Sequence, residues 1–182
     1  MMKHLFPPVI FLSFIISCNT AISQTKSTGP IIEEFGEVYK VSDPDFKVDT
    51  KMAFQAVFDI MDSPDSHEEL NRSIETAARF LNMHAQSGIP RDQIKVALVF
   101  HNKASKDVMD NKAYQKRYGK DNPNQKLIQA LLAAGGQVIF CGQSSNARDI
   151  PKKDLIAGVQ ISLSAMTALI QLQNQDFRLI KF

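Results

Sequence analysis

Apolar residues gather in short runs from about residue 53 onward, and the segments between these runs repeat their apolar positions at helical spacing. The runs AFQAVFDI (53–60), IKVALVF (94–100) and QVIFC (137–141) each have the length of a strand. Such β-branched and aliphatic runs are typical of parallel strands that are covered on both faces. A brief apolar stretch, VQISL (159–163), and the terminal FRLIKF (177–182), which predicts a last strand, complete the series.

The segments after the first two runs predict helices. Ser66 and Glu69 have the spacing of a capping box, in which each side chain binds the backbone N–H of the other residue at a helix start. The apolar residues that follow at helical spacing are Leu70, Ile74, Ala77, Ala78 and Leu81. The charged, irregular segment 101–119 predicts an exposed loop with a short helix. Asn122-Pro123 then predicts the start of a helix that ends at Gly135-Gly136.

The last part of the chain predicts two more helices. Pro151 and Gly158 bound a short one, and Ser164 is the expected cap of a longer one. The apolar residues on one face of the longer helix, which we expect in the core, are Met166, Leu169 and Ile170. Strands that alternate with helices across short connections predict one α/β domain over residues 51–182, a parallel sheet of about five strands flanked by helices.

The first 23 residues have the layout of a secretory signal peptide, with an apolar stretch between a lysine and small polar residues. Ala21-Ile22-Ser23 fits a signal peptidase site, whereas Ile15-Ile16-Ser17-Cys18 resembles a lipobox that would leave Cys18 as a lipidated first residue. The lipobox lacks its usual leucine, so we expect cleavage after Ser23 and export to the periplasm or the medium, with a lipoprotein as the alternative. Residues 24–50 predict an N-terminal arm or small hairpin. No later segment approaches the roughly 18 apolar residues of a membrane helix.

Composition excludes several classes of partner. Lysine and arginine number 21 against 19 aspartate and glutamate residues, a formal net charge of +2. That field is too weak to attract nucleic acid or an anionic membrane surface. The chain has no Cys-x-x-Cys pair, no glycine-rich phosphate loop and no His-x-x-x-His spacing, so the sequence predicts neither a cofactor nor a metal site.

Cys141 would be the only cysteine of the mature chain, which excludes a disulfide-stabilised scaffold. Such a thiol is either buried and inert or retained for its reactivity, and both interpretations stay open. Cys141, His101 and Asn102 all follow strands, at the edge where parallel sheets present functional groups. Backbone amides after Cys141 and the cation of Arg148 would favour the thiolate. His101 as a solvated loop residue and Arg148 as a loop salt bridge are the structural alternatives.

The segments around these residues resemble the DsrE/DsrF-like family of sulfur-relay proteins. The stretch VIFCGQSSNARDIPKKDL (138–155) combines a strand, a cysteine, and an alanine and an arginine six and seven residues later. VFHNKAS (99–105) and SAMTALIQLQNQDFRLIKF (164–182) are also similar to the family. The resemblance implies a parallel sheet flanked by helices, subunits that assemble into trimers or hexamers, and a cysteine that accepts sulfane sulfur as a persulfide and passes it on. Matched by position, that cysteine is Cys141.

Two functions of different classes follow from these observations. The first is an exported protein that handles sulfane sulfur through Cys141, with a small sulfur species or a thiol partner protein as its counterpart. The second is a non-catalytic, oligomeric binding or structural module of the same fold, in which the cysteine is incidental. The sulfur relay toward tRNA thiolation runs in the cytosol, and an exported protein would not meet its partners. The resemblance therefore identifies Cys141 as the candidate thiol but does not identify the pathway in which it acts.

Overall fold

The central feature of the protein is a sheet of five parallel strands. A computed structural model describes Met2 and residues 25–181. The strands are β3 (Phe54–Ile60), β4 (Ile94–Phe100), β5 (Gln137–Cys141), β6 (Gln160–Ser162) and β7 (Arg178–Ile180). They lie in the order β6-β5-β4-β3-β7, and every neighbouring pair is parallel. The predicted α/β fold is therefore confirmed.

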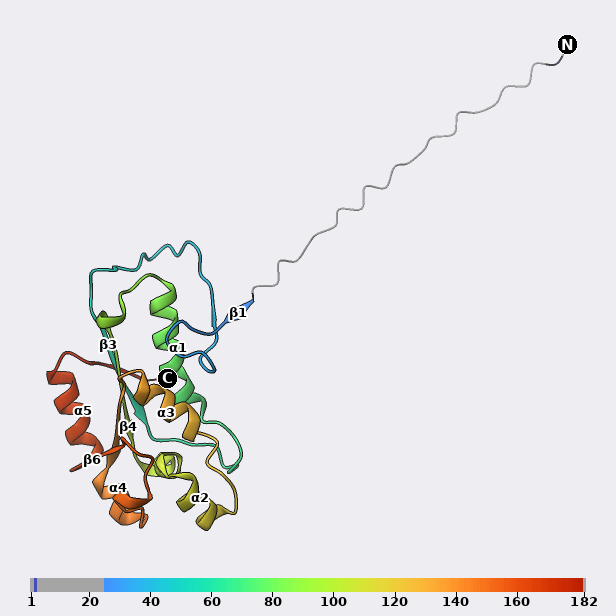
Figure 1. Ribbon diagram of the computed structural model, residues 1–182. Coiled ribbons are helices and arrows are strands. Elements are labelled where there is room, and N and C mark those ends of the chain that lie inside the picture. Colours follow the sequence, from blue (N-terminus) through green and yellow to red (C-terminus); the bar gives the residue numbers. More distant parts are fainter. Residues whose placement is uncertain (1, 3–24, 182) are drawn as a thin grey trace.

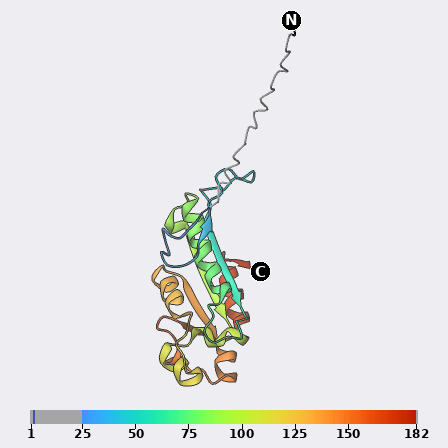
Figure 2. The ribbon, with the colours of Figure 1, turned by 90° about the vertical axis from the view of Figure 1, so that its right-hand side faces the viewer.

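Helices cover both faces of this sheet. The helices are α1 (Arg72–Gln86), α2 (Asn111–Tyr118), α3 (Gln125–Ala133), α4 (Gly142–Ala147) and α5 (Ala165–Asn174). The shorter 3-10 helices are η1 (Arg91–Gln93), η2 (Asn102–Val108) and η3 (Lys152–Asp154). Figure 1 shows α5 on one side of the strands and α1 and α3 on the other. In both ribbon views α2 and α4 lie at the end of the molecule where the strands finish (Figures 1 and 2).

Each face of the sheet has its own buried cluster. The larger cluster lies beneath α1 and α3 and includes Phe58, Leu98 and Phe140 from the strands. The smaller cluster consists of Val57, Ala97, Val99, Cys141, Ala165, Ala168, Leu172 and Phe177. Successive residues of a strand point to opposite faces, so Phe140 packs in the larger cluster and Cys141 in the smaller one. The thiol therefore faces α5.

The segment before the sheet is held against α1. Strands β1 (Lys26–Ser27) and β2 (Val38–Tyr39) form a short antiparallel pair. The fully buried Asn82 of α1 accepts the N–H of Ile32 at 2.9 Å and donates to the carbonyls of Ile32 and Phe35 at 2.9 and 3.0 Å. The predicted cleavage sites after Ser23 and before Cys18 lie outside the described residues.

Two predicted helix starts are wrong. Helix α1 begins at Arg72 with Asn71 as its cap, whose side chain accepts the N–H of Ser73, so Ser66 and Glu69 form no capping box. Helix α3 begins at Gln125 after Asn124, two residues later than Asn122-Pro123 predicted.

These helices begin where they do because a buried carboxylate, Asp107, binds the side chains of both cap residues, Asn71 and Asn124. It accepts hydrogen bonds from the amides of Asn71 at 2.8 Å and Asn124 at 3.2 Å, from the Ser63 hydroxyl at 2.8 Å and from the Lys106 ammonium at 3.2 Å. The side chain of Asp107 is completely buried. Burial raises its pKa, although the contacts from Asn71, Lys106 and Ser63 act in the opposite direction. A satisfied buried charge of this kind fixes where the surrounding helices begin.

The segment 101–119 is also less exposed than predicted. It forms η2 and α2, and its inner side is buried at Ala104, Ser105, Asp107, Val108, Met109 and Tyr114. The expected helix after Pro151 is only the 3-10 turn η3, whereas the cap at Ser164 is confirmed, because its hydroxyl accepts the N–H of Thr167 at 3.1 Å.

The predicted core face of α5 is wrong for Met166 and Ile170, whereas Leu169 is partly buried and packs against the smaller cluster. Met166 and Ile170 are 73% and 58% exposed. The helix buries Ala165, Ala168 and Leu172 instead, and the two alanines let it approach the sheet closely. An exposed apolar surface is left on its outer side.

Candidate functional site

Cys141 is the last residue of β5 and is followed directly by α4. Only 5% of its surface is exposed, and it packs in the cluster that contains Ala165, the first residue of α5. The thiol therefore lies between the amino-terminal ends of α4 and α5.

Two opposing effects act on the pKa of Cys141. Burial raises it, because the thiolate loses its hydration. The backbone N–H groups of Ser144, Ala165 and Gln143 and the hydroxyl of Ser144 stabilise the thiolate, and together they outweigh burial. The net result is a pKa of Cys141 below its ordinary value of 9.0, which increases the population of the nucleophilic form.

Gly142 allows β6 to approach the site closely. A β-carbon on Gly142 would lie 2.5 Å from the carbonyl oxygen of Ser162, which is far inside van der Waals contact. Ser162 is also the partner of Cys141 in the ladder between β5 and β6. A larger residue after Cys141 would push β6 away and change the position of the thiol.

Asn102 and Arg148 meet at this edge of the sheet. Asn102 adopts the left-handed backbone conformation, with φ of 52°, which asparagine tolerates better than most residues. Its N–H donates to the Ser144 hydroxyl at 3.2 Å, and its side-chain oxygen accepts from the Arg148 guanidinium at 3.0 Å. Arg148 thus reaches the environment of Cys141 through Asn102 and Ser144.

His101 makes a different set of contacts. Its Nε2 lies 2.8 Å from Oδ1 of Asp59, at the end of β3, and the Lys181 ammonium lies 3.9 Å from the other oxygen of Asp59. Among the described residues, none of the hydrogen bonds of His101 reaches Cys141. The histidine therefore belongs to a polar group with Asp59 beside the site.

Sequence patterns missed three contributors to this edge of the sheet. Ser144 follows Cys141 by three residues, which is the spacing at which a residue in the first turn faces the cap position, so it could have been found. Asp59 is the single charged residue in the run 53–60 and could also have been noticed. The N–H of Ala165 reaches the thiol only because α5 packs there, which no local signal indicates.

The described residues offer no metal site at this position. Nowhere in residues 25–181 do three histidine, cysteine, aspartate or glutamate side chains come close enough to hold an ion. In the same part of the chain, no helix is both long enough and apolar enough to cross a membrane.

Comparison with known proteins places this fold in a family. The DsrE/DsrF-like family model matches residues 55–182, a range that contains Cys141, His101, Asn102 and Arg148. No curated protein shows significant similarity to the chain. A protein of unknown function from Methanobacterium thermoautotrophicum has a similar structure, with a TM-score of 0.52 and 14% identity over 70% of this chain and 97% of its own. The ychN protein of E. coli has a TM-score of 0.52 and 19% identity over 71% of this chain and 99% of its own. At these identities the two structures establish only the fold. The family model matches most of the chain, and this protein therefore belongs to the DsrE/DsrF-like family.

Proposed function

We propose that this protein handles sulfane sulfur through a persulfide on Cys141. The observation that carries the proposal is the set of donors from Ser144, Ala165 and Gln143 that lowers the pKa of the thiol. Thiolate is the form that attacks a sulfane sulfur atom. Membership of a family whose cysteine-containing members relay sulfur supports the same chemistry.

The transfer needs no cofactor. The Cys141 thiolate attacks the outer sulfur of a polysulfide or of a persulfide on a partner thiol, and a new S–S bond forms. The S–S bond of the donor breaks at the same time, and its electron pair leaves with the departing thiolate. Attack by an acceptor thiolate on the outer sulfur of the Cys141 persulfide then regenerates the free Cys141 thiolate, so no separate oxidant is consumed.

The burial of Cys141 favours a second candidate. With 5% of its surface exposed, the thiol could be an inert part of the cluster under α5, and the protein would then be a non-catalytic oligomeric module. Rapid labelling of the native protein by a maleimide supports the sulfur carrier, whereas labelling only after denaturation supports the module.

Sulfur uptake gives the direct test. Incubation of the reduced protein with polysulfide should add about 32 Da to the peptide that contains Cys141, and a reductant should remove it. The Cys141→Ser variant should take up no sulfur. A wild type without the adduct, or an adduct that persists in Cys141→Ser, would leave the structural module as the better description.

We also propose that the protein is exported and that the mature chain begins at Gln24. Every described element starts at Lys26 or later, so cleavage after Ser23 leaves all of them intact. The intact mass of the protein that is measured in the same experiment tests this proposal, since a diacylated Cys18 at the amino terminus would contradict it.

We propose further that the protein is a homo-oligomer, a trimer or a hexamer. The family resemblance suggests assembly, and the outer side of α5 supplies apolar side chains that a second copy would cover. Leu163 and Met166 are each 73% exposed, and Ile170 is 58% exposed. Leu163 lies just before α5 and the other two lie on it, and larger exposed apolar patches mark interaction sites.

A further inference from the structure

A hollow lies at the edge of the sheet where β3, β4 and β5 end. Its volume is about 490 Å³, within the range of small-molecule sites. The loop after β3, helix η2, the last turn of α2 and the end of α4 all contribute to its lining. Ligands of parallel α/β sheets bind at the carboxyl ends of the strands, because the loops that follow the strands carry functional side chains there. Cys141 is not among the residues that line this hollow.

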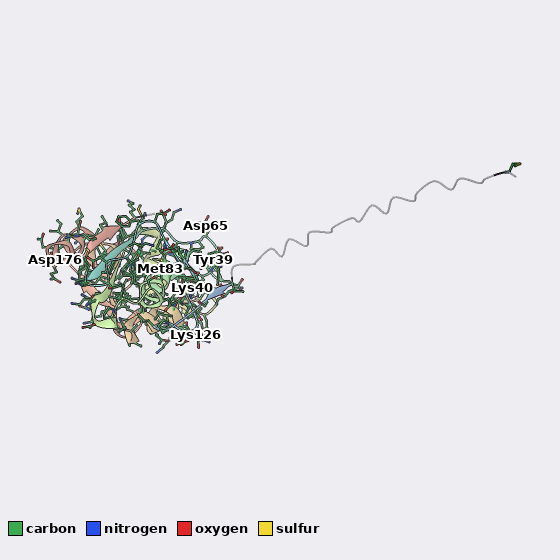
Figure 3. All side chains as sticks on the ribbon, turned by 90° about the horizontal axis from the view of Figure 1, so that it is seen from above. Tyr39, Lys40, Asp65, Met83, Lys126 and Asp176 are labelled. Atoms are coloured by element: carbon green, nitrogen blue, oxygen red, sulfur yellow. The ribbon has the colours of Figure 1, made fainter. Side chains whose placement is uncertain are left out.

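The lining is strongly basic. Four cationic side chains face the hollow, from Lys103, Lys106, Arg117 and Arg148, and Asp65 supplies one carboxylate. Asp65 is the only aspartate or glutamate among the lining residues, so the acidic segment after β3 contributes little negative charge to the hollow. Figure 3 shows Asp65 at one edge of the molecule, with its side chain directed outward.

Most of this positive charge is not neutralised by carboxylates. Lys106 is paired with Asp107, and its side chain is only 12% exposed. Lys103, Arg117 and Arg148 make no salt bridge to a carboxylate within residues 25–181. Like charges that are gathered in one hollow repel each other, so a bound anion would relieve an unfavourable interaction.

The two guanidinium groups are held in place by neutral oxygens. Arg117 donates to the carbonyl oxygens of Arg148 at 3.0 Å and Asp149 at 2.7 Å, which ties α2 to the loop after α4. Arg148 donates through one nitrogen to the side-chain oxygen of Asn102 at 3.0 Å. Each guanidinium has five N–H donors, so both retain donors for a ligand while their orientation is fixed. Planar guanidinium groups match the oxygens of phosphate and sulfate, to which they donate pairs of hydrogen bonds.

We propose that this hollow binds a small ligand that carries a tetrahedral oxyanion, of the phosphate or sulfate type. The volume exceeds that of an inorganic ion, so a compact organic phosphate fits as well. The binding depends on Lys103, Arg117 and Arg148 and does not need the thiol. Arg148 also reaches the environment of Cys141 through Asn102, so the two sites are neighbours, but the proposed ligand does not contact the thiol.

Calorimetric titration of the full protein at low salt tests the site, with inorganic phosphate in one arm and glycerol 3-phosphate in the other. We expect measurable binding of at least one probe, and the tighter of the two identifies the source of the oxyanion. Lys103→Glu should weaken that binding at least tenfold. Lys103 is exposed and has no ion-pair partner among the described residues, so its replacement should leave the fold intact.

Two matched variants complete the test. Lys126→Glu makes the same charge change on α3, in a different hollow, and should alter binding less than twofold. Figure 3 shows Lys126 and Asp65 on opposite edges of the molecule. Cys141→Ser should bind phosphate as the wild type does, which separates this site from the sulfur chemistry. No binding of either probe, or equal losses in Lys103→Glu and Lys126→Glu, would overturn the proposal.

Discussion

At the scale of single residues, Ser144 connects the parts of the candidate site. Its backbone and its hydroxyl both stabilise the Cys141 thiolate, and the same hydroxyl accepts the N–H of Asn102. Sequence patterns could identify Cys141, Asn102 and Arg148, because each lies just after a strand or a turn at one edge of the sheet. They could not identify the Ala165 N–H, which depends on the packing of a helix that begins 24 residues later in the sequence than Cys141.

Removal of the Ser144 hydroxyl should make Cys141 less reactive at neutral pH. Ser144→Ala deletes one donor, so the pKa of the thiol rises toward its ordinary value and the thiolate becomes scarcer. A hydrogen bond to a charged group contributes about 1.5 kcal/mol or more, so alkylation by iodoacetamide at pH 7 should slow about tenfold. The inflection of the rate against pH should move upward.

The matched control is Gln143→Ala, which keeps the backbone N–H that acts on the thiolate. Its side chain donates to the carbonyl of Leu163 at 3.2 Å, so the variant removes a contact near the site without removing a donor to sulfur. Equal inflection points in the wild type and Ser144→Ala would show that the hydroxyl does not stabilise the thiolate.

At the scale of elements, the strands and the start of α5 could be predicted from the sequence, but the starts of α1 and α3 could not. The runs 94–100 and 137–141 coincide with β4 and β5, because β-branched and aliphatic residues in sequence have few alternatives to a buried strand. The starts of α1 and α3 depend on Asp107, which lies 36 residues from Asn71 and 17 from Asn124. A capping box is a local pattern, and a buried carboxylate that binds both true caps overrides it.

Asn71 should therefore contribute more to the stability of the fold than an ordinary helix cap does. Asn71→Ala removes the cap bond to Ser73 and the donor to Asp107, and we expect the free energy of unfolding to fall by about 2–4 kcal/mol. Ser164→Ala, which removes the cap of α5 but touches no buried charge, should cost only about 1 kcal/mol. Urea unfolding of the three proteins measures both differences. Similar losses of unfolding free energy in the two variants would mean that the hydrogen bond from Asn71 to Asp107 contributes no stability beyond that of an ordinary helix cap.

At the scale of the whole molecule, the two faces of the sheet are unequally covered. Helices α1 and α3 share the face of the larger cluster, whereas α5 alone packs on the other face (Figure 1). The sequence predicted Met166, Leu169 and Ile170 on the inner face of α5, but only Leu169 packs there, beside Ala165, Ala168 and Leu172. Amino-acid type alone does not separate an apolar core face from an apolar surface that another subunit covers. The exposure of these residues thus becomes a reason to expect assembly.

Introducing charged residues on the outer side of α5 by mutation should prevent assembly of the subunits. The wild type should have three or six times the protomer mass by light scattering at micromolar concentration, and the double variant Met166→Glu, Ile170→Glu should have the protomer mass. The reason is that an interface between copies would have to bury two unpaired carboxylates in each subunit, at a cost of several kcal/mol. Both side chains are largely exposed in the single chain, so the fold itself should tolerate the change.

The control is Met83→Glu on α1, a methionine that is 46% exposed and labelled in Figure 3, and this variant should stay assembled. A wild type that is monomeric would remove the proposal of an oligomer, and a double variant that stays assembled would place the interface on a surface other than α5.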